Sequence, residues 1–217
     1  MSSRTLVLMT TKQSLEWRYA TKKFDTKKAL PAADLDYILE CGNLTATSFG
    51  LQPFGIVAVT DPTKKAALME AAYGQEHVGN NGALLVLCAR TDVDEAFITE
   101  FTTRLETKCG LEAGAADGYK DMMVGSLTSK SAEEVLTWSQ KQAYIVLGSM
   151  MIAAAEKMVD GCPLEGFDPA AFNDILGLTE HNLHATNLLA LGYRSEEDET
   201  QHHAKVRKDL ADIVVRI

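Results

Sequence analysis

The chain has 217 residues, of which 46% are hydrophobic and 24% are charged, and its formal net charge is −9. This length allows a full hydrophobic core within one compact domain, so a single domain over residues 1–217 is expected. The acidic balance argues against nucleic acid or an anionic membrane as a partner, because the sequence-independent part of such binding is cationic.

The cysteines and the apolar runs predict a reducing, cytoplasmic location. The apolar run Leu6–Met9 is too short for a signal peptide, and the longest apolar stretch, Ala143 to Ala155, is too short to span a bilayer. No C-x-x-C spacing occurs among the four cysteines, which are expected to be reduced and structural. They are Cys41, Cys88, Cys109 and Cys162.

The first half of the chain is predicted to alternate helices with buried strands. Apolar spacing and helix-start signals predict three helices. These are Thr11 through Trp17, Pro31 to an end at Gly42, and Asp61-Pro62 towards Tyr73. Two runs rich in apolar residues, Phe54 to Thr60 and Ala83 to Ala89, have the length of buried strands.

The stretch from Asp92 to Ser131 is helical in pattern but weakly so. Gly110, Gly114 and Gly118 interrupt it in polar surroundings. Few apolar contacts would hold such a segment, so it is predicted to be a mobile helical insertion and a candidate lid.

The second half contains the strongest predicted helix, Trp138 to Met158, which is apolar on nearly all sides and therefore expected to pack against another helix or subunit. Asp168-Pro169 is expected to begin a short helix that ends near Gly177. Asn187 to Gly192 and Asp212 to Ile217 are predicted to be strands.

The histidines are not expected to form a metal site. Adjacent residues on a strand point to opposite sides, and no cysteine or carboxylate cluster completes a ligand set around His202-His203. His181 and His184 are predicted to lie in a surface loop beside Glu180.

Three distant segments stand out because cations occur in two of them. Arg18, Lys22 and Lys23 precede Phe24, and Lys205 and Arg207 lie near the C-terminus. Taken separately, such cations are typical of a solvated helix end, because the dipole at a helix C-terminus favours positive charge. Taken together, they are of the kind that holds a phosphate by charge-assisted hydrogen bonds. The third segment, Pro163 to Phe167, reads as a tight, mostly apolar turn.

The order and content of these segments resemble the FMN-dependent nitroreductases, most closely the branch of oxygen-insensitive NAD(P)H nitroreductases and dihydropteridine reductases. The resemblance also covers a Ser/Thr-rich loop that ends in Gln52-Pro53-Phe54 and the amide residue Gln75. It implies an α+β fold of three layers (α/β/α), with a mostly antiparallel sheet flanked by helices and a C-terminal strand exchanged in a homodimer.

The resemblance implies a role for each matching residue. Arg18 and the Lys205-Val206-Arg207 segment would hold the FMN phosphate, Lys22 and Gln75 would approach the ring, and the Glu165-Gly166 backbone would lie near flavin N5. The loop of Thr47 and Ser48 would reach the flavin of the other subunit, and Phe49 and Tyr119 would face the substrate. The full set of cofactor-binding residues implied is Arg18, Tyr19, Ala20, Lys22, Ala46, Thr47, Ser48, Gly50, Gln75, Pro163, Leu164, Glu165, Gly166, Lys205 and Arg207.

The sequence departs from the family at two positions. Gly50 stands where an Asn is usual, and Val78 or the nearby His77 stands where a cation often follows the amide residue. Both departures concern how strongly the pyrimidine edge of the ring would be held.

The function implied is hydride transfer from NAD(P)H through flavin N5 to a nitroaromatic, quinone, pteridine or flavin acceptor in two half-reactions at one site. The cofactor performs this chemistry, so no side chain is assigned as a general acid or base. NAD(P)H would visit as a diffusing substrate, because no G-x-G-x-x-G or P-loop is present. Three alternatives stay open: a flavin-binding redox sensor without turnover, a specialised relative such as an enone reductase or flavin-fragmenting enzyme, and an α/β domain without cofactor, for which the match of the three segments would be a coincidence.

Overall fold

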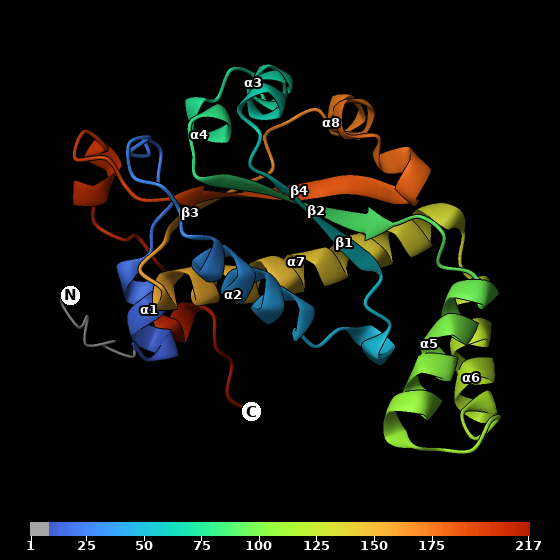
Figure 1. Cartoon of the computed structure of the whole chain (residues 1–217). Coiled ribbons are helices and arrows are strands. Elements are labelled where there is room, and N and C mark those ends of the chain that lie inside the picture. The colour runs from blue at the N-terminus through green and yellow to red at the C-terminus, as the bar shows by residue number, and fades with distance from the viewer. Residues whose placement is uncertain (1–8) are drawn as a thin grey trace.

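A computed structural model describes residues 9–217, so the apolar run Leu6–Met9 lies outside the described residues except for Met9. The chain forms an antiparallel sheet covered by helices on both faces (Figure 1). Its strands, in the order β1-β2-β4-β3, are β1 (Phe54–Val59), β2 (Ala83–Arg90), β3 (Asp160–Leu164) and β4 (Leu183–Gly192). The α-helices are α1 (Thr11–Trp17), α2 (Ala32–Asn43), α3 (Pro62–Ala71), α4 (Glu76–Gly79), α5 (Glu95–Cys109), α6 (Asp117–Thr128), α7 (Ala132–Glu156) and α8 (Pro169–Leu176).

The three-layer arrangement follows from the two faces of β2. Every residue from Ala83 to Ala89 is fully buried, and alternate side chains enter two separate hydrophobic clusters. Leu84 and Val86 pack towards α3 and α8, whereas Leu85 and Leu87 pack towards α2 and α7. Figure 1 shows α3, α4 and α8 on one face and α7 and α2 on the other. The predicted α/β/α architecture with an antiparallel sheet is thereby confirmed.

Helix boundaries differ from the predictions at α7 and at α2. α7 begins at Ala132 instead of Trp138, because the Ser131 side chain accepts a hydrogen bond from the Glu134 N–H and the Glu134 carboxylate accepts one from the Ser131 N–H. α2 begins after Pro31, which is its N-cap, and continues past Gly42. Gly42 does not end that helix: a Cβ there would lie 3.0 Å from Met150 Sδ, so the glycine permits close packing on α7.

The prediction of a turn at Pro163-Leu164 was wrong, because both residues belong to β3. Pro163 and Leu164 pair with Leu189 and Leu188 of β4. β3 is an edge strand of the sheet, where a proline is tolerated because its missing N–H removes no ladder bond. The turn starts only at Glu165.

The prediction of a loop at His184 was also wrong. β4 begins at Leu183, before the predicted Asn187, and His184 pairs with Ala89 of β2. The imidazole Nδ1 lies 3.1 Å from Asn173 Nδ2 of α8, and the Ala185 N–H donates to Asn173 Oδ1. The Asn173 side chain of α8 thus stabilises the polar first residues of β4, which the apolar pattern of the sequence did not indicate. His181 is exposed, as predicted.

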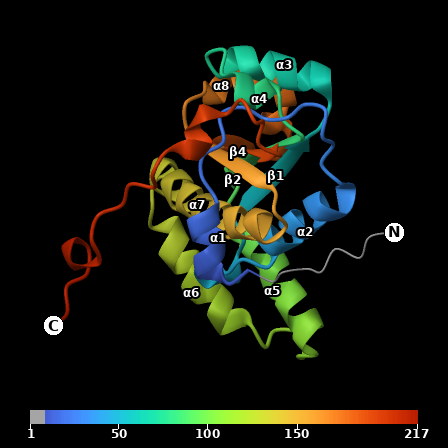
Figure 2. The same ribbon diagram turned by 90° about the vertical axis from the view of Figure 1, so that its left-hand side faces the viewer.

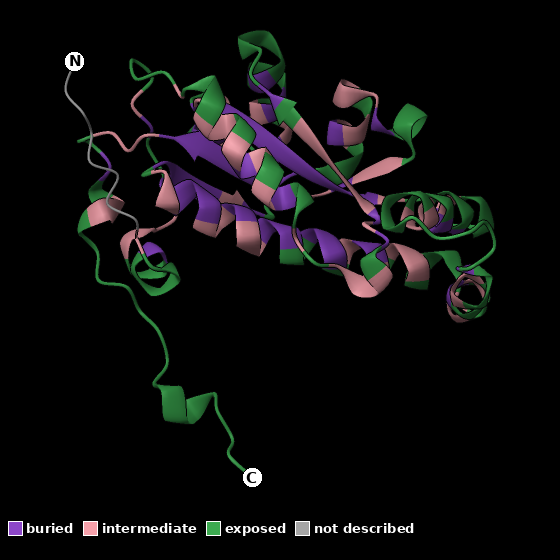
Figure 3. Ribbon diagram, turned by 60° about the horizontal axis from the view of Figure 1, so that its bottom comes forward, coloured by how far each residue is buried: buried purple, intermediate pink, exposed green. Residues whose placement is uncertain are grey.

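The C-terminal segment forms no strand within this chain. Residues Leu210–Asp212 make a short 3-10 helix, and the following residues up to Ile217 are exposed. Figures 2 and 3 show this segment leaving the body of the molecule. A strand needs the edge of another strand, and the described chain offers none at this place; exchange with a second subunit therefore stays a prediction.

α5 and α6 form a helical hairpin at the opposite end from α1 (Figure 1). Its interior is a small apolar cluster that includes Ile98 of α5, Met123 of α6 and Leu51. The stretch predicted as a helical insertion is thus two helices joined by the glycine-containing segment 110–116.

Two further expectations concern membranes and thiols. Among residues 9–217, no helix combines the length and the apolar character needed to cross a lipid bilayer. All four cysteines are free thiols; Cys88 and Cys162 are buried, whereas Cys109 is exposed at the end of α5.

Candidate functional site

The N-terminal and C-terminal cation segments meet at one hollow of about 580 Å³. Its walls come from residues 16–20, from β3 and from residues 194–207. Arg18, Lys205 and Arg207 all line this hollow, and none of them lies within ion-pair distance of a carboxylate in the described part of the chain. Glu16 also lines the hollow, but these three cations leave it with a net positive charge, on a protein whose overall charge is −9.

Arg18 and Lys205 lie close enough to the other cations for their pKa values to be affected. Burial lowers the pKa of Lys205, and the charges of Arg18 and Arg207 lower it further. The pKa of Arg18 is also lowered, chiefly by burial and in part by Arg207. An anion bound between them would relieve this repulsion.

Lys205 is held at the end of α1. Its Nζ donates to Leu15 O at 2.6 Å and to Arg18 O, two carbonyls left free at the helix C-terminus. An ammonium has three N–H donors, so one remains for a ligand. Lys205 thus does interact with a helix C-terminus, as the alternative explanation of these cations predicts. The Arg18 side chain, in contrast, lines the hollow.

The segment after Arg18 is anchored by a buried carboxylate. Asp198, only 2% exposed, accepts from the Tyr19 hydroxyl at 3.0 Å and from the Lys22 N–H at 2.9 Å. Burial alone would raise the pKa of Asp198, but hydrogen bonds from Thr200, the Lys22 N–H and Tyr19 outweigh it and lower the pKa. Ala20 forms a β-bridge with Gly161, which places the segment along the edge of β3.

The turn after β3 is fixed by backbone and amide contacts. Gln75 Nε2 donates to Gly166 O at 2.5 Å, and the Asp168 N–H donates to Ala71 O at 2.9 Å. The Glu165 carboxylate accepts from the Tyr144 hydroxyl of α7 at 2.8 Å. Because its side chain is held by α7, Glu165 can present its backbone to a ligand.

A group of polar side chains lies behind this turn. Lys22 Nζ is 3.4 Å from Cys162 Sγ, and the Lys22 charge also acts on His77. His77 is 8% exposed and its Nε2 has no partner in the described residues. Burial first, and Lys22 second, lower the pKa of His77 to about 4, so this imidazole is neutral at pH 7. His77, and not Val78 of the hydrophobic core, is thus the residue near Lys22.

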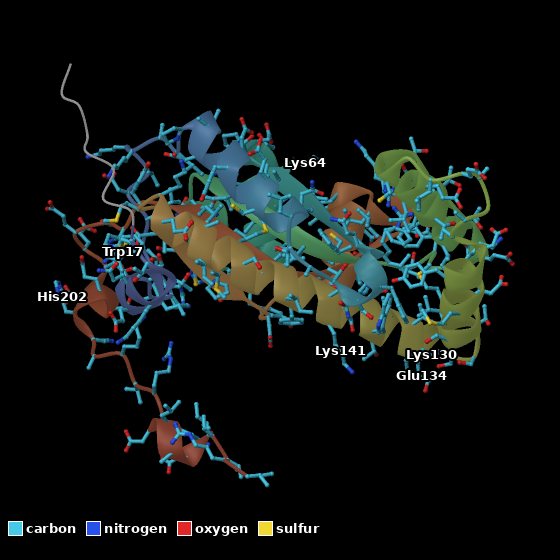
Figure 4. All side chains as sticks on the ribbon, turned by 90° about the horizontal axis from the view of Figure 1, so that it is seen from below. Trp17, Lys64, Lys130, Glu134, Lys141 and His202 are labelled. Atoms are coloured by element: carbon cyan, nitrogen blue, oxygen red, sulfur yellow. The ribbon has the colours of Figure 1, made fainter. Side chains whose placement is uncertain are left out.

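The loop of Thr47, Ser48 and Gly50 lies elsewhere. The Ser48 N–H donates to Gln142 Oε1 of α7 at 2.9 Å, and Thr47 Oγ1 accepts from the Gln52 N–H. Gln142 and Glu156 are about 21 Å apart along α7 at 1.5 Å per residue, and β3 begins after the Glu156 end. The turn after β3 lies nearer to Gln142, because Glu165 contacts Tyr144. Figure 4 shows Trp17, beside the hollow, and Lys141 far apart along the molecule.

The two residues predicted to face the substrate, Phe49 and Tyr119, contact each other at this second place. Their ring centroids are 6.5 Å apart, edge to face, and the Tyr119 hydroxyl donates to Phe49 O at 3.0 Å. Phe49 has a φ of 59°, a left-handed conformation that costs a bulky residue energy and that this hydrogen bond helps to hold.

One chain therefore holds the predicted site residues in two groups. The first group joins the cation hollow to the neighbouring turn: Arg18, Tyr19, Ala20, Lys22, Gln75, Pro163, Leu164, Glu165, Gly166, Lys205 and Arg207. The second lies beside the α5–α6 hairpin: Ala46, Thr47, Ser48, Phe49, Gly50 and Tyr119. Among residues 9–217, no described hydrogen bond or ring contact joins a residue of one group directly to a residue of the other.

Sequence reasoning missed Arg194, Asp198 and the part played by His77. Arg194 and Asp198 occur in an ordinary-looking polar stretch between β4 and the C-terminal cations. The available signal was the start of a short helix at Asp198, whose side chain caps Thr200. Nothing in the local sequence indicates that the same carboxylate also binds Tyr19.

With fold and site described, the class of protein can be stated: the chain belongs to the nitroreductase family, whose sequence pattern matches residues 15–193. YfkO of Bacillus subtilis, which bears the name of an NAD(P)H nitroreductase, is 32% identical over 209 residues, covering 91% of this chain and 93% of YfkO.

Solved structures share the fold. One, from Staphylococcus epidermidis and titled an NAD(P)H:FMN oxidoreductase, superposes with a TM-score of 0.86 at 17% identity, with full coverage of both chains. Another, from Exiguobacterium sibiricum, is a nitroreductase in complex with FMN; its TM-score is 0.82 at 18% identity, covering 96% of this chain and 98% of that chain.

Proposed function

We propose that this chain is an FMN-dependent oxidoreductase that takes electrons from NAD(P)H and passes them to a small organic acceptor. The observation that carries the proposal is the meeting of Arg18, Lys205 and Arg207 at one hollow without carboxylate partners among residues 9–217. Family membership and the FMN found in the Exiguobacterium protein support the choice of ligand.

The residues present fit FMN. A phosphate monoester needs fixed cations and N–H donors, which the hollow supplies. A planar ring needs a flat, hydrogen-bonding wall free of bulky side chains, and the backbone at Glu165-Gly166 is of this kind. Gly166 carries no Cβ on that wall and is exposed.

Each residue would have a distinct part in the bound state. Arg18 and Arg207 would hold the phosphate, with the third N–H of Lys205 as a further donor. Gln75 and Lys22 offer an amide and an ammonium group for the polar edge of the ring, and the neutral His77 lies behind them. FMN supplies reversible hydride transfer when it is bound. The contribution of the chain is positioning, positive charge and the exclusion of water.

A second copy of the chain would complete the site. The Thr47–Gly50 loop and Tyr119 do not line the cation hollow of their own chain, so we assign their contact with FMN to the second copy. The outer face of α7 bears exposed Tyr144 and Ile145 beside Gly148, where a Cβ would meet open space; this face suits a partner helix. We therefore include the homodimer in the proposal.

The test is the absorption spectrum of the purified protein, followed by anaerobic addition of NADH or NADPH. A flavin spectrum that bleaches on addition and returns with a quinone or nitroaromatic acceptor is the expected result. A flavin that bleaches but is reoxidised by no acceptor indicates a redox sensor. A protein that binds no FMN when it is supplied overturns the proposal.

A further inference from the structure

Arg194 stands where β4 ends and lines the cation hollow, but its charge is neutralised. Asp160, 3% exposed, accepts hydrogen bonds from the Arg194 backbone N–H at 2.8 Å and from Nε at 2.8 Å. Its Oδ1 also lies 2.6 Å from Nη2, which completes an ion pair, although Nη2 has no hydrogen-bond partner among the described residues. In this pair one edge of the guanidinium, Nε with Nη2, faces a single oxygen of a buried carboxylate, whose other oxygen accepts from the backbone N–H. Arg194 therefore adds little net charge for an anion.

The planar face of Arg194 has a different contact. The guanidinium carbon lies 4.5 Å from the centroid of the Trp17 ring and 4.7 Å from that of Tyr19. These are cation–π distances, and the two rings immediately flank Arg18 in sequence. Arg194 thus holds the chain on both sides of the residue that directs its side chain into the hollow.

Asp198 holds the same segment from a second direction. Its carboxylate binds the Tyr19 hydroxyl and the Lys22 N–H, as described above. Tyr19 is therefore held twice, through its ring by Arg194 and through its hydroxyl by Asp198. Burial raises the pKa of Tyr19 to about 12, with the hydrogen bond to Asp198 as the second cause, so the phenol keeps its proton.

We infer that Arg194, through its pair with Asp160, and Asp198 are positioning residues that hold Arg18 in place for a phosphate monoester. The inference rests on the proposed function. Arg18 ends α1 in an extended conformation and has no ion-pair partner of its own in the described residues, so its direction depends on its neighbours. Rigid support of a binding residue lowers the entropy lost when the ligand binds.

The test compares FMN with riboflavin, which has the same ring but no phosphate. Arg194→Lys keeps the charge but loses the planar fork that stacks and pairs. Its Kd for FMN should rise about tenfold, whereas its Kd for riboflavin should stay within about twofold of wild type. Both constants are measured by quenching of flavin fluorescence, and circular dichroism checks the fold. Asp160→Asn serves as a second variant if Arg194→Lys does not fold, with the same expected pattern, because the described side-chain bonds of Asp160 are all to Arg194. Asp198→Asn, which also releases the Lys22 N–H, should weaken FMN more than riboflavin.

A matched control is available in Arg90→Lys. Arg90 also pairs with an aspartate, Asp92, and also lies over an aromatic ring, Phe97, but it lines no part of the hollow. Its substitution should leave both flavin constants unchanged. An equal loss for FMN in this control would overturn the positioning role, because general destabilisation would then explain the effect.

The double variant Arg18→Ala/Arg194→Lys decides how Arg194 acts. If Arg194 works through Arg18, the double variant binds FMN as weakly as Arg18→Ala alone. The inference is overturned if the fold-changes in the Kd for FMN of the two single variants multiply in the double variant. It is also overturned if Arg194→Lys weakens FMN and riboflavin binding equally. A wild-type chain that binds FMN beside an Arg194→Lys variant with unchanged affinity overturns the positioning role alone. A wild-type chain that binds no FMN overturns the proposed function and the inference with it.

Discussion

At the scale of single residues, the hollow owes its charge to arginines and a lysine that are far apart in sequence. Lys205 uses two of its N–H donors on carbonyls at the end of α1. Arg18 and Arg207 therefore have the most N–H donors left for a phosphate. Arg207 Nη1 is bound only to the adjacent Val206 O, at 2.6 Å, among the side-chain contacts described.

Arg207→Ala is expected to weaken FMN binding about tenfold or more, because a charge-assisted hydrogen bond to phosphate is lost. The Kd is measured by flavin fluorescence. Lys208→Ala is the matched control, since it removes a neighbouring cation that does not line the hollow. Unchanged affinity in both Arg18→Ala and Arg207→Ala would show that the phosphate is held elsewhere.

The turn after β3 offers a second test. Glu165→Gln should retain much of the activity, because the carboxylate faces Tyr144 and not the proposed ring. Gly166→Val should fold, since a Cβ there would be 3.4 Å from Gln75 Nε2, an ordinary contact, but it should lower the flavin content. The flavin-to-protein absorbance ratio measures this. A Gly166→Val protein with normal flavin content and full activity contradicts the assignment.

The lowered pKa of His77 predicts that the free energy of unfolding depends on pH. Its pKa is lowered to about 4 in the folded chain, against an ordinary value near 6.5, mainly by burial. Between these values the unfolded chain binds a proton that the folded chain does not, so the free energy of unfolding falls as pH drops from 6.5 to 4. The loss is up to about 3 kcal/mol and ends below pH 4.

Urea denaturation at pH 4.5, 5.5 and 7 measures this slope. His77→Gln should flatten it, whereas His181→Gln, which alters an exposed histidine, should leave it as in wild type. Equal slopes in wild type and His77→Gln would mean that His77 does not stay neutral in the folded chain.

At the scale of elements, the α5–α6 hairpin contacts the rest of the chain through few residues. Its cluster includes Leu51, and Tyr119 joins it to the loop at Phe49. The residues beside it are those expected to face the acceptor in a dimer. A hairpin with so small an interior can adjust to acceptors of different size.

Tyr119→Ala is therefore expected to change the ranking of acceptors more than the Kd for FMN. It removes the edge contact with Phe49 and the hydrogen bond to Phe49 O; Tyr119→Phe, which removes only the hydrogen bond, should have a smaller effect. The measurement is kcat/KM for a quinone and for a nitroaromatic. Identical ratios in all three proteins would exclude a role for Tyr119 in acceptor choice.

At the scale of the whole molecule, two apolar surfaces are left uncovered by residues 9–217. One is the outer face of α7, and the other is the C-terminal segment, where Val215 is 85% exposed. Large apolar side chains in such positions are typical of subunit contacts.

Deletion of residues 209–217 is expected to impair both dimer formation and FMN binding, because the segment would add to the partner's surface near its site. Sedimentation velocity and flavin content measure the two effects. Asp212→Ala, which keeps the apolar residues of the segment, should remain a dimer. A flavin-loaded wild-type monomer at micromolar concentration, or a normal dimer after the deletion, contradicts this arrangement.

The sequence by itself determined the local elements and the segments that matter. Buried strands such as β2 and capped helices such as α8 are encoded by adjacent residues: a continuous apolar run, or Asp168 before Pro169 with Gly177 at the end. The site motifs are also visible in the sequence, because the residues of each motif are adjacent along the chain.

Only the tertiary structure decided which of these segments meet. The contact between Asp198 and the Lys22 N–H joins residues 176 positions apart, and the support of Arg18 by Arg194 has no local signature. The strand start at His184 depends on Asn173 of a packed helix, and the final segment forms no strand because a strand requires another edge. Local patterns record what a residue's neighbours in sequence allow, whereas packing and burial, which set the charge and direction of each site residue, arise only when distant segments come together.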